Sequence, residues 1–273
     1  MLFRSHQHAW DFRDAPLVYK AFLGNQLKQD GVQLKWLAPT DLFMEVGAEL
    51  AGGDRFPGGG NNKNGVGGRS LFGHLGGDIG ESTAWKLGLA RLTTRPEARS
   101  YDDADSTGTT VSNAFSGRSS LWSLGGVLKW APAGNSTVTN FKLQGEYFRR
   151  RQNGALTFDS AGATGATATD SYDTSQSGWY LQGVYQFMPR WRAGLRHDRL
   201  SSGGVNLGAG LLANVATFDY KPTRNAAMLD WSPSEFSRLR LQFGRDQSLQ
   251  GVTDRQVFLQ YIYSLGAHGA HKF

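Results

Sequence analysis

Segments of about ten residues in which apolar and polar side chains alternate recur along nearly the whole chain. In 122–130, for example, Trp122, Leu124 and Trp130 share one face, and Lys129 lies on the other. A period of two is the signature of a β-strand with two different faces. Charged residues recur on the polar faces, and aromatic residues stand eight positions apart on apolar faces. This combination favours strands that cross a membrane as a β-barrel.

Twelve strands of this kind are predicted, joined by connections that alternate between short and long. Outer-membrane barrels alternate short periplasmic turns with long outer loops in the same way. We therefore predict an all-β fold: a transmembrane antiparallel up-and-down β-barrel of about twelve strands over 17–273, after an N-terminal periplasmic segment, 1–16. A soluble β-sandwich with a charged outer face is the alternative, because its strands also alternate. The predicted strands are 17–27, 32–37, 42–51, 70–79, 84–93, 118–130, 139–149, 177–187, 190–200, 224–231, 236–246 and 254–265.

The composition agrees with a barrel better than with a water-soluble enzyme. The chain has 36 glycines, 16 phenylalanines, 8 tryptophans and 9 tyrosines, but only 39% hydrophobic residues. The absence of cysteine excludes disulfides, Cys-based zinc sites and a thiol nucleophile. The net charge of +6 is spread along the chain, so no nucleic-acid partner is expected. No Ser/His/acid constellation stands out, and we expect no enzymatic activity.

The N-terminus does not resemble an export signal, although an outer-membrane location in a Gram-negative bacterium requires export. Residues 1–13 contain neither an apolar core nor a small-residue cleavage site. We therefore expect a fragment of a longer gene product, the alternative being removal of the signal.

The stretch 207–216 is apolar enough to form a further pair of strands.

The charged faces of the predicted strands are expected to line the lumen. Buried charges must be paired or hydrated, so two arrangements are open. One is a salt-bridged lattice that braces a narrow, nearly closed barrel. The other is a hydrated pore in which the excess of Arg and Lys favours anions. The predicted lumen-lining residues are Lys35, Glu45, Glu49, His74, Asp78, Lys86, Lys142, Glu146, Arg192, Arg196, Asp198, Asp230, Arg238, Arg240 and Arg245.

Both ends of the chain carry features of their own. His6 and His8 near the start, and His268 and His271 near the end, have spacings that can chelate zinc or another divalent metal. The alternative is that they are polar tail residues. The terminal Phe273 resembles the aromatic C-terminus that barrels present to their assembly machinery. The run 149–151 consists of three arginines, which either bind lipopolysaccharide phosphates or form a solvated strand end.

Six stretches together carry a resemblance to a known family: HAWDFRDAPLVYKAFLG (8–24), DGVQLKWLAPTDLFMEVGAEL (30–50), NFKLQGEYF (140–148), GWYLQGVYQFMPRWRAGLRHDRL (178–200), DWSPSEFSRLRLQF (230–243) and FLQYIYSLGAHGAHKF (258–273). They resemble proteobacterial outer-membrane β-barrel proteins, often described as zinc-regulated TonB-dependent outer-membrane receptors, in their C-terminal barrel portion. The resemblance implies an outer-membrane barrel with a link to metal uptake. The sequence contains no evident plug domain or TonB-contacting segment, and 22-stranded plugged transporters are far larger. A TonB contact is therefore not expected.

These observations predict a porin-like outer-membrane barrel for passage or uptake of small polar or charged solutes, with a possible zinc link. The alternative function is a non-transporting structural or adhesion barrel with a charge-filled lumen. The expected partners are outer-membrane lipid, lipopolysaccharide and the barrel assembly machinery.

Overall fold

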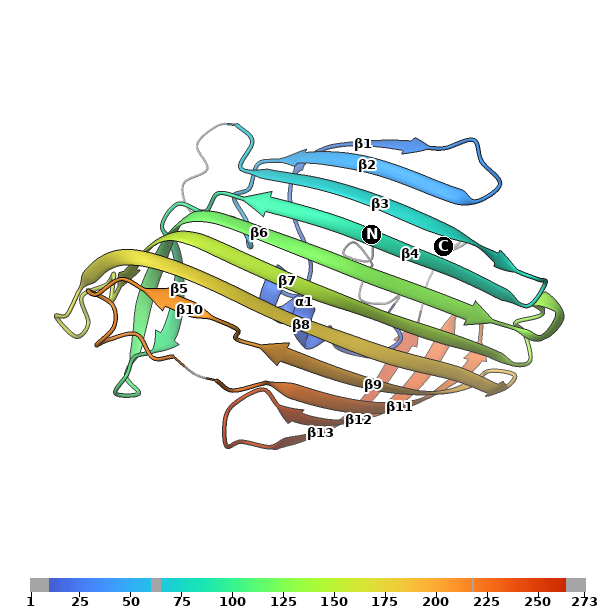
Figure 1. Ribbon diagram of the computed structural model, residues 1–273. Coiled ribbons are helices and arrows are strands. Elements are labelled where there is room, and N and C mark those ends of the chain that lie inside the picture. The colour runs from blue at the N-terminus through green and yellow to red at the C-terminus, as the bar shows by residue number, and fades with distance from the viewer. Residues whose placement is uncertain (1–9, 60–64, 218, 264–273) are drawn as a thin grey trace.

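One large antiparallel β-sheet with a short helix on its concave side makes up the computed structural model, which describes residues 10–59, 65–217 and 219–263 (Figure 1). The elements in chain order are α1 (Leu17–Leu23), β1 (Gly31–Leu37), β2 (Phe43–Ala51), β3 (Gly68–Ile79), β4 (Thr83–Thr94), β5 (Arg99–Ala104), β6 (Thr110–Trp130), a 3-10 turn (Pro132–Gly134), β7 (Asn140–Phe158), β8 (Ala168–Met188), β9 (Trp191–Ser201), β10 (Val205–Leu207), β11 (Thr223–Ser234), β12 (Ser237–Gln247) and β13 (Asp254–Tyr263).

The strands follow one another in simple up-and-down order. The hydrogen-bonded path is β1-β2-β3-β4-β6-β7-β8-β9-β11-β12-β13, while β5 pairs with β6 and β10 pairs with β8. Each of the eleven strands on this path corresponds to a predicted strand, so those predictions are confirmed. The predicted alternation of connections is also confirmed. Short connections (38–42, 80–82, 131–139, 189–190 and 235–236) lie at one end of the sheet, and long ones lie at the other (Figure 1).

The first predicted strand, 17–27, is wrong, because this segment contains α1. Its flanking residues are typical helix boundaries: Pro16 precedes the first turn, and Gly24 adopts a left-handed conformation (φ 60°) just after the last. The segment also lacks the polar face that a strand of this sheet requires, since Lys20 is its one charged residue. Its buried residues are Leu17, Val18, Tyr19, Phe22 and Leu23.

The three central strands are longer than predicted. β6 and β8 have 21 residues each and β7 has 19, so they extend into the expected loops 94–117 and 152–176. The extension buries a second apolar cluster at the long-connection end of the sheet. Leu211, in the stretch after β10, contributes to it. The strand pair suspected over 207–216 is wrong, because β10 reaches only Leu207 and the rest of the stretch makes a single isolated bridge, between Val215 and Asp105. The cluster consists of Val111, Phe115, Leu156, Phe158 and Leu211.

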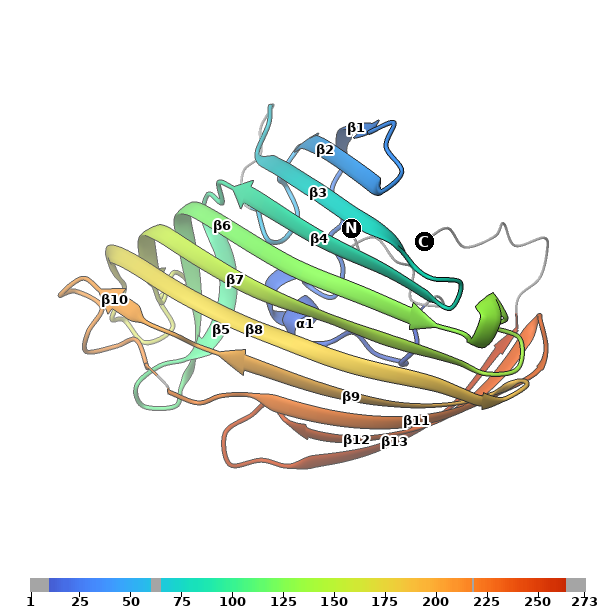
Figure 2. The ribbon, with the colours of Figure 1, turned by 45° about the vertical axis from the view of Figure 1, so that its right-hand side comes forward.

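The two faces of the sheet have opposite character, and the polar one is inside. The sheet is curved, and α1 lies in its concavity (Figure 2). Leu124 and Leu195 on the convex face are 55% and 69% exposed, whereas Asp230 and Arg240 on the concave face are 0% and 1% exposed. None of the helices in the described part of the chain has the length and apolar character needed to cross a membrane.

The strand path ends at β1 and β13. Within the described residues these two strands have no pairing with each other, so the sheet is not closed there. β1 and β13 run in the same direction, because ten successive antiparallel pairings separate them. A direct pairing of β1 with β13 would therefore be parallel.

Candidate functional site

Residues 10–29, here called the inner segment, run along the concave face from the short-connection end to the long-connection end. Near its start, the Asp11 carboxylate lies 2.7 Å from Lys142 Nζ, at the short-connection end of β7. Near its end, the Gln29 side-chain amide donates to the Arg55 carbonyl in the connection after β2. The described part of the predicted periplasmic segment, 10–16, therefore lies against the sheet rather than apart from it.

Asp230 is the centre of the ionic contacts at the short-connection end. Its carboxylate accepts from Arg240 Nε at 2.8 Å and from Arg192 Nη2 at 2.6 Å. Arg238 Nε lies further away, at 3.9 Å. Arg192 also reaches Asp11 at 3.5 Å, so the inner segment joins the same network.

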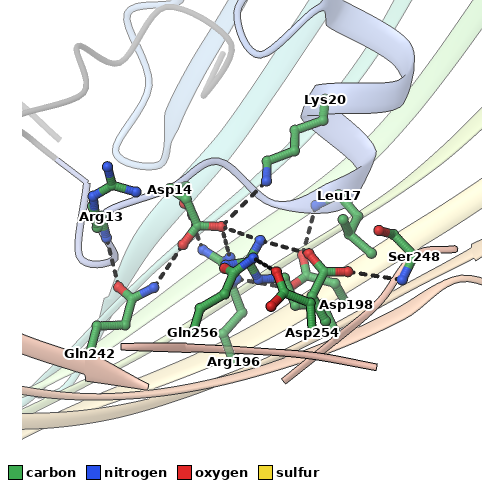
Figure 3. Close-up of polar contacts among 12 residues, drawn as sticks. Arg13, Asp14, Leu17, Lys20, Arg196, Asp198, Gln242, Ser248, Asp254 and Gln256 are labelled. Carbon is green, nitrogen blue, oxygen red and sulfur yellow. Dashed lines mark hydrogen bonds and ion pairs between the residues drawn. The ribbon is translucent and has the colours of Figure 1, made fainter. Parts of the chain in front are cut away.

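Asp14 is the second carboxylate that the inner segment contributes, and it lies among basic groups of the sheet (Figure 3). Arg196 Nη2 lies 2.9 Å away and Arg224 Nη1 3.2 Å away. The Gln242 amide donates to Asp14 at 2.7 Å, and Lys20 of α1 lies at 3.8 Å. Asp14 therefore neutralises cations that two different strands carry.

Asp198 positions α1 while it pairs with Arg196. Its Oδ2 accepts from Arg196 Nε at 2.8 Å, and its Oδ1 accepts from the backbone N–H of Leu17 at 3.0 Å. The first N–H groups of a helix have no partner within the helix, so this carboxylate satisfies one of them.

Glu146 joins the helix to the middle of the sheet. It accepts hydrogen bonds from the Tyr19 hydroxyl at 2.6 Å and from the Tyr180 hydroxyl at 2.8 Å. Gln144 donates to the Tyr180 hydroxyl at 2.8 Å. All four side chains are buried, so the group forms a continuous polar network under α1.

Apolar packing accompanies these polar contacts. Val18 and Phe22 of α1 pack in one cluster with Phe72, Leu121 and Phe148 on the concave face. Apolar residues that face a water-filled lumen are unfavourable, whereas the inner segment covers them. Each fully buried side chain of this size is worth about 1.5–3 kcal/mol. The inner segment is therefore an integral part of the packed interior.

A small cavity remains between the inner segment and the sheet. Its volume is about 80 Å³, and polar and aromatic side chains line it. Asp11 and Lys142 lie at this cavity together with Tyr19, Tyr180 and Arg196. Little free space is left in this part of the concave face.

A separate polar group lies on the β1–β4 side. Glu45 accepts from His74 Nδ1 at 3.0 Å and lies 3.6 Å from Lys35 Nζ. Lys86 lies over the Phe43 ring, 4.8 Å from its centroid. This group is more open than the network around Asp230. Of the remaining predicted lumen residues here, Glu49 is buried and hydrogen-bonded to Gln33, and Asp78 is exposed at the strand end.

Arg245 is the exception among the predicted lumen-lining residues. Its assignment to the lumen assumed that the alternation of the strand shifts by one residue at Gly244. No shift occurs, because the β11–β12 register runs unbroken from Thr223↔Gln247 to Trp231↔Leu239. Arg245 consequently shares the convex face with Phe243 and is exposed. By strand alternation, the other predicted lumen-lining residues occupy the concave face.

The predicted metal ligands His6, His8, His268 and His271 lie outside the described residues. Within the described ranges, no group of three or more His, Cys, Asp or Glu residues could hold a metal ion.

Sequence reasoning missed Asp11, Asp14, Arg224 and Gln242 as parts of the site. The first two belong to a stretch assigned to the periplasm, and Arg224 begins a strand whose charge was not singled out. The one available signal was the pattern Asp-Phe-Arg-Asp at 11–14, which places charges beside an aromatic residue. It does not identify the strands that these charges contact.

These features define a large antiparallel β-sheet protein with an apolar convex face and a charged concave face occupied by its own N-terminal segment. No known family model matches the chain. The chain is similar to an uncharacterised protein of Aquifex aeolicus (strain VF5), with 27% identity over 300 aligned positions. The match covers 98% of this chain and 56% of the relative, so the chain spans about half the length of that protein.

Proposed function

We propose that this protein is an outer-membrane β-barrel of a Gram-negative bacterium that passes small anionic solutes when its inner segment is displaced. One observation carries the proposal: apolar residues lie exposed on the convex face of strand after strand, while arginine–carboxylate networks fill the concave face. In a water-soluble sheet protein the apolar face is covered. A lipid-facing barrel has the reverse arrangement.

The location in a membrane requires that the edges of β1 and β13 be covered. Unpaired backbone groups cannot face hydrocarbon, where each costs several kcal/mol. We therefore propose closure of the sheet into a barrel, through β1 and β13 themselves or through further strands between them. The proposal assigns the short connections to the periplasm and the long ones to the cell exterior.

The charges on the concave face support the choice of anions. The ion-pair network that Asp11 and Asp14 join contains six basic residues and three carboxylates of the sheet, and Glu146, which contacts Tyr19, lies outside these ion pairs. From the inner segment, Asp11 and Asp14 supply two further negative charges, and Lys20, 3.8 Å from Asp14, supplies one positive charge. Displacement of that segment leaves basic groups without these counter-ions, and carboxylate or phosphate groups are suited to replace them. The basic residues are Lys142, Arg192, Arg196, Arg224, Arg238 and Arg240, and the carboxylates are Asp198, Asp230 and Asp246.

A non-transporting barrel is the second candidate function. The extensive packing of α1 and the many ion pairs beside it favour this function, because a lumen filled in this way braces the strands without opening. The link to zinc uptake that the family resemblance implies stays a separate prediction. It depends on zinc binding by His6, His8, His268 and His271.

Planar-bilayer conductance separates the two functions. We expect the wild type to be closed most of the time, and Asp11→Asn/Asp14→Asn to open more often, with a reversal potential that shows anion preference. Asp41→Asn/Asp219→Asn removes the same charge from exposed connections and should behave like the wild type. Absence of conductance steps in all three proteins, across a range of salt concentrations, contradicts transport and leaves the structural barrel.

A further inference from the structure

The convex face is asymmetric along the strands. In the eleven strands of the path, its charged residues lie at the middle of a strand or in the half toward the long connections, and all but Asp173 are arginines. The half toward the short connections has aromatic residues instead, among them Trp130, Phe187, Trp231 and Tyr263. The outward arginines are Arg69, Arg91, Arg118, Arg149, Arg151, Arg199, Arg245 and Arg255.

Two of these arginines form a direct cross-strand pair. Arg245 of β12 and Arg255 of β13 are register partners, and both are exposed on the convex face. Like charges directly opposite each other on an antiparallel pair are destabilising. No carboxylate lies within ion-pair distance of either guanidinium among the described residues. An anion that binds both groups at once removes this repulsion.

A wide apolar depression has this pair in its lining and extends over the five neighbouring strands β8, β9, β11, β12 and β13. Its volume is about 870 Å³. Its lining includes the small residues Gly183 and Ala227, which leave space above the sheet, and the larger residues Trp179, Leu195 and Phe243. The depression is open toward the convex side, where the proposed barrel meets lipid. Its shape and apolar lining are suited to hydrocarbon chains.

The depth of the pair agrees with a lipid headgroup. Arg255 lies eight residues from Tyr263, the aromatic residue at the short-connection end of β13. This is about 26 Å along the strand at ~3.3 Å per residue, or about 20 Å along the membrane normal at the strand tilt of about 35–45°. The apolar band of an outer-membrane barrel is about 25 Å tall, and a lipid-facing arginine costs about 2–4 kcal/mol at its middle but only about 0–1 kcal/mol near its edge. The backbone of the pair therefore lies in the outer part of the apolar band, and the long arginine side chains reach the level of the lipid phosphates.

We propose that Arg245 and Arg255, with the depression lined by Trp179, Leu195 and Phe243, bind a phosphorylated multi-acyl glycolipid of the lipid A type. The guanidinium groups bind its phosphate through bidentate hydrogen bonds, and its acyl chains lie in the depression. Because the arginines are absent from the short-connection half, the site accepts lipid from the outer leaflet, which faces the cell exterior. The site rests on the membrane placement proposed above.

Lipid binding to the refolded full chain in detergent micelles tests the site by native mass spectrometry. Bis-phosphorylated lipid A should bind the wild type at least tenfold more tightly than lipid A without phosphates. Arg245→Ala/Arg255→Ala should weaken binding of phosphorylated lipid A at least tenfold. Ala227→Trp, which fills the floor and keeps both arginines, should also weaken it. The control Arg69→Ala/Arg118→Ala removes two outward charges outside the depression and should stay within twofold of the wild type.

Equal lipid A affinity for the wild type and the Arg245/Arg255 variant overturns the site, as does phosphatidylglycerol binding as tightly as lipid A. Insertion into phosphatidylcholine vesicles, read by protease protection, is measured on the same proteins. Failure of the wild type to insert contradicts the membrane placement itself. Insertion without lipid A binding contradicts only this site.

Discussion

At the scale of single residues, Asp230 shows how the concave face holds its charges. Its carboxylate is fully buried and contacts Arg240 and Arg192, which come from two different strands. A buried ion pair contributes little net stability because desolvation offsets the attraction, but loss of one partner leaves an uncompensated charge. Removal of the Asp230 carboxylate is therefore costly mainly because it leaves buried arginines without a counter-ion.

We expect Asp230→Asn to lower the free energy of unfolding by about 3–5 kcal/mol, the range found when one partner of a buried pair is removed. Urea titration of the refolded protein in micelles measures this. Asp78→Asn, an exposed aspartate on the same face, should change stability by less than about 0.5 kcal/mol. Similar effects of the two substitutions would contradict the network.

The concave placement of Asp230, Arg240 and Arg192 could be predicted from sequence, because strand alternation alone decides which face a residue occupies. Their partners could not. Alternation gives no register between strands, and it does not show that Asp11 and Asp14 supply counter-ions from a segment without strand character. Arg245 was misplaced because a glycine was taken as an interruption of the register.

At the scale of secondary-structure elements, α1 depends on tertiary packing. It has only seven residues, and isolated helices shorter than about 12–15 residues are marginal in water. Its apolar residues surround the helix instead of alternating, which is why a strand prediction failed there. The eleven strands were predictable because each has two distinct faces. The far extensions of β6, β7 and β8 were not, since their composition resembles that of polar loops.

Phe22→Ala tests the dependence of α1 on the sheet. Phe22 packs against Phe148 with ring centroids 6.3 Å apart, and truncation of a buried Phe typically costs about 3–5 kcal/mol. We expect faster amide hydrogen exchange in 17–24 while the exchange of β7 changes little. Lys20→Ala, on the partly exposed side of α1, should have a much smaller effect. Unchanged exchange in the Phe22 variant would show that α1 is held by its polar contacts alone.

At the scale of the whole molecule, the distribution of polarity decides the environment. An apolar convex face of this extent is a liability in water, where exposed patches beyond a few hundred Å² mark interaction surfaces. In lipid the same face is favourable, and the charged concave face is shielded by the sheet and the inner segment. Contact of the convex face with hydrocarbon is therefore the central property of the proposed barrel.

Spin-label accessibility on neighbouring residues tests that claim most directly. Leu124 points to the convex face and Ser123 to the concave one. In lipid vesicles, a nitroxide at position 124 should collide with oxygen far more often than with a water-soluble nickel complex. A nitroxide at 123 should be shielded from oxygen by comparison. Position 195 should match 124, and position 196 should match 123. Higher accessibility of 124 and 195 to the nickel complex than to oxygen would contradict the membrane-facing sheet.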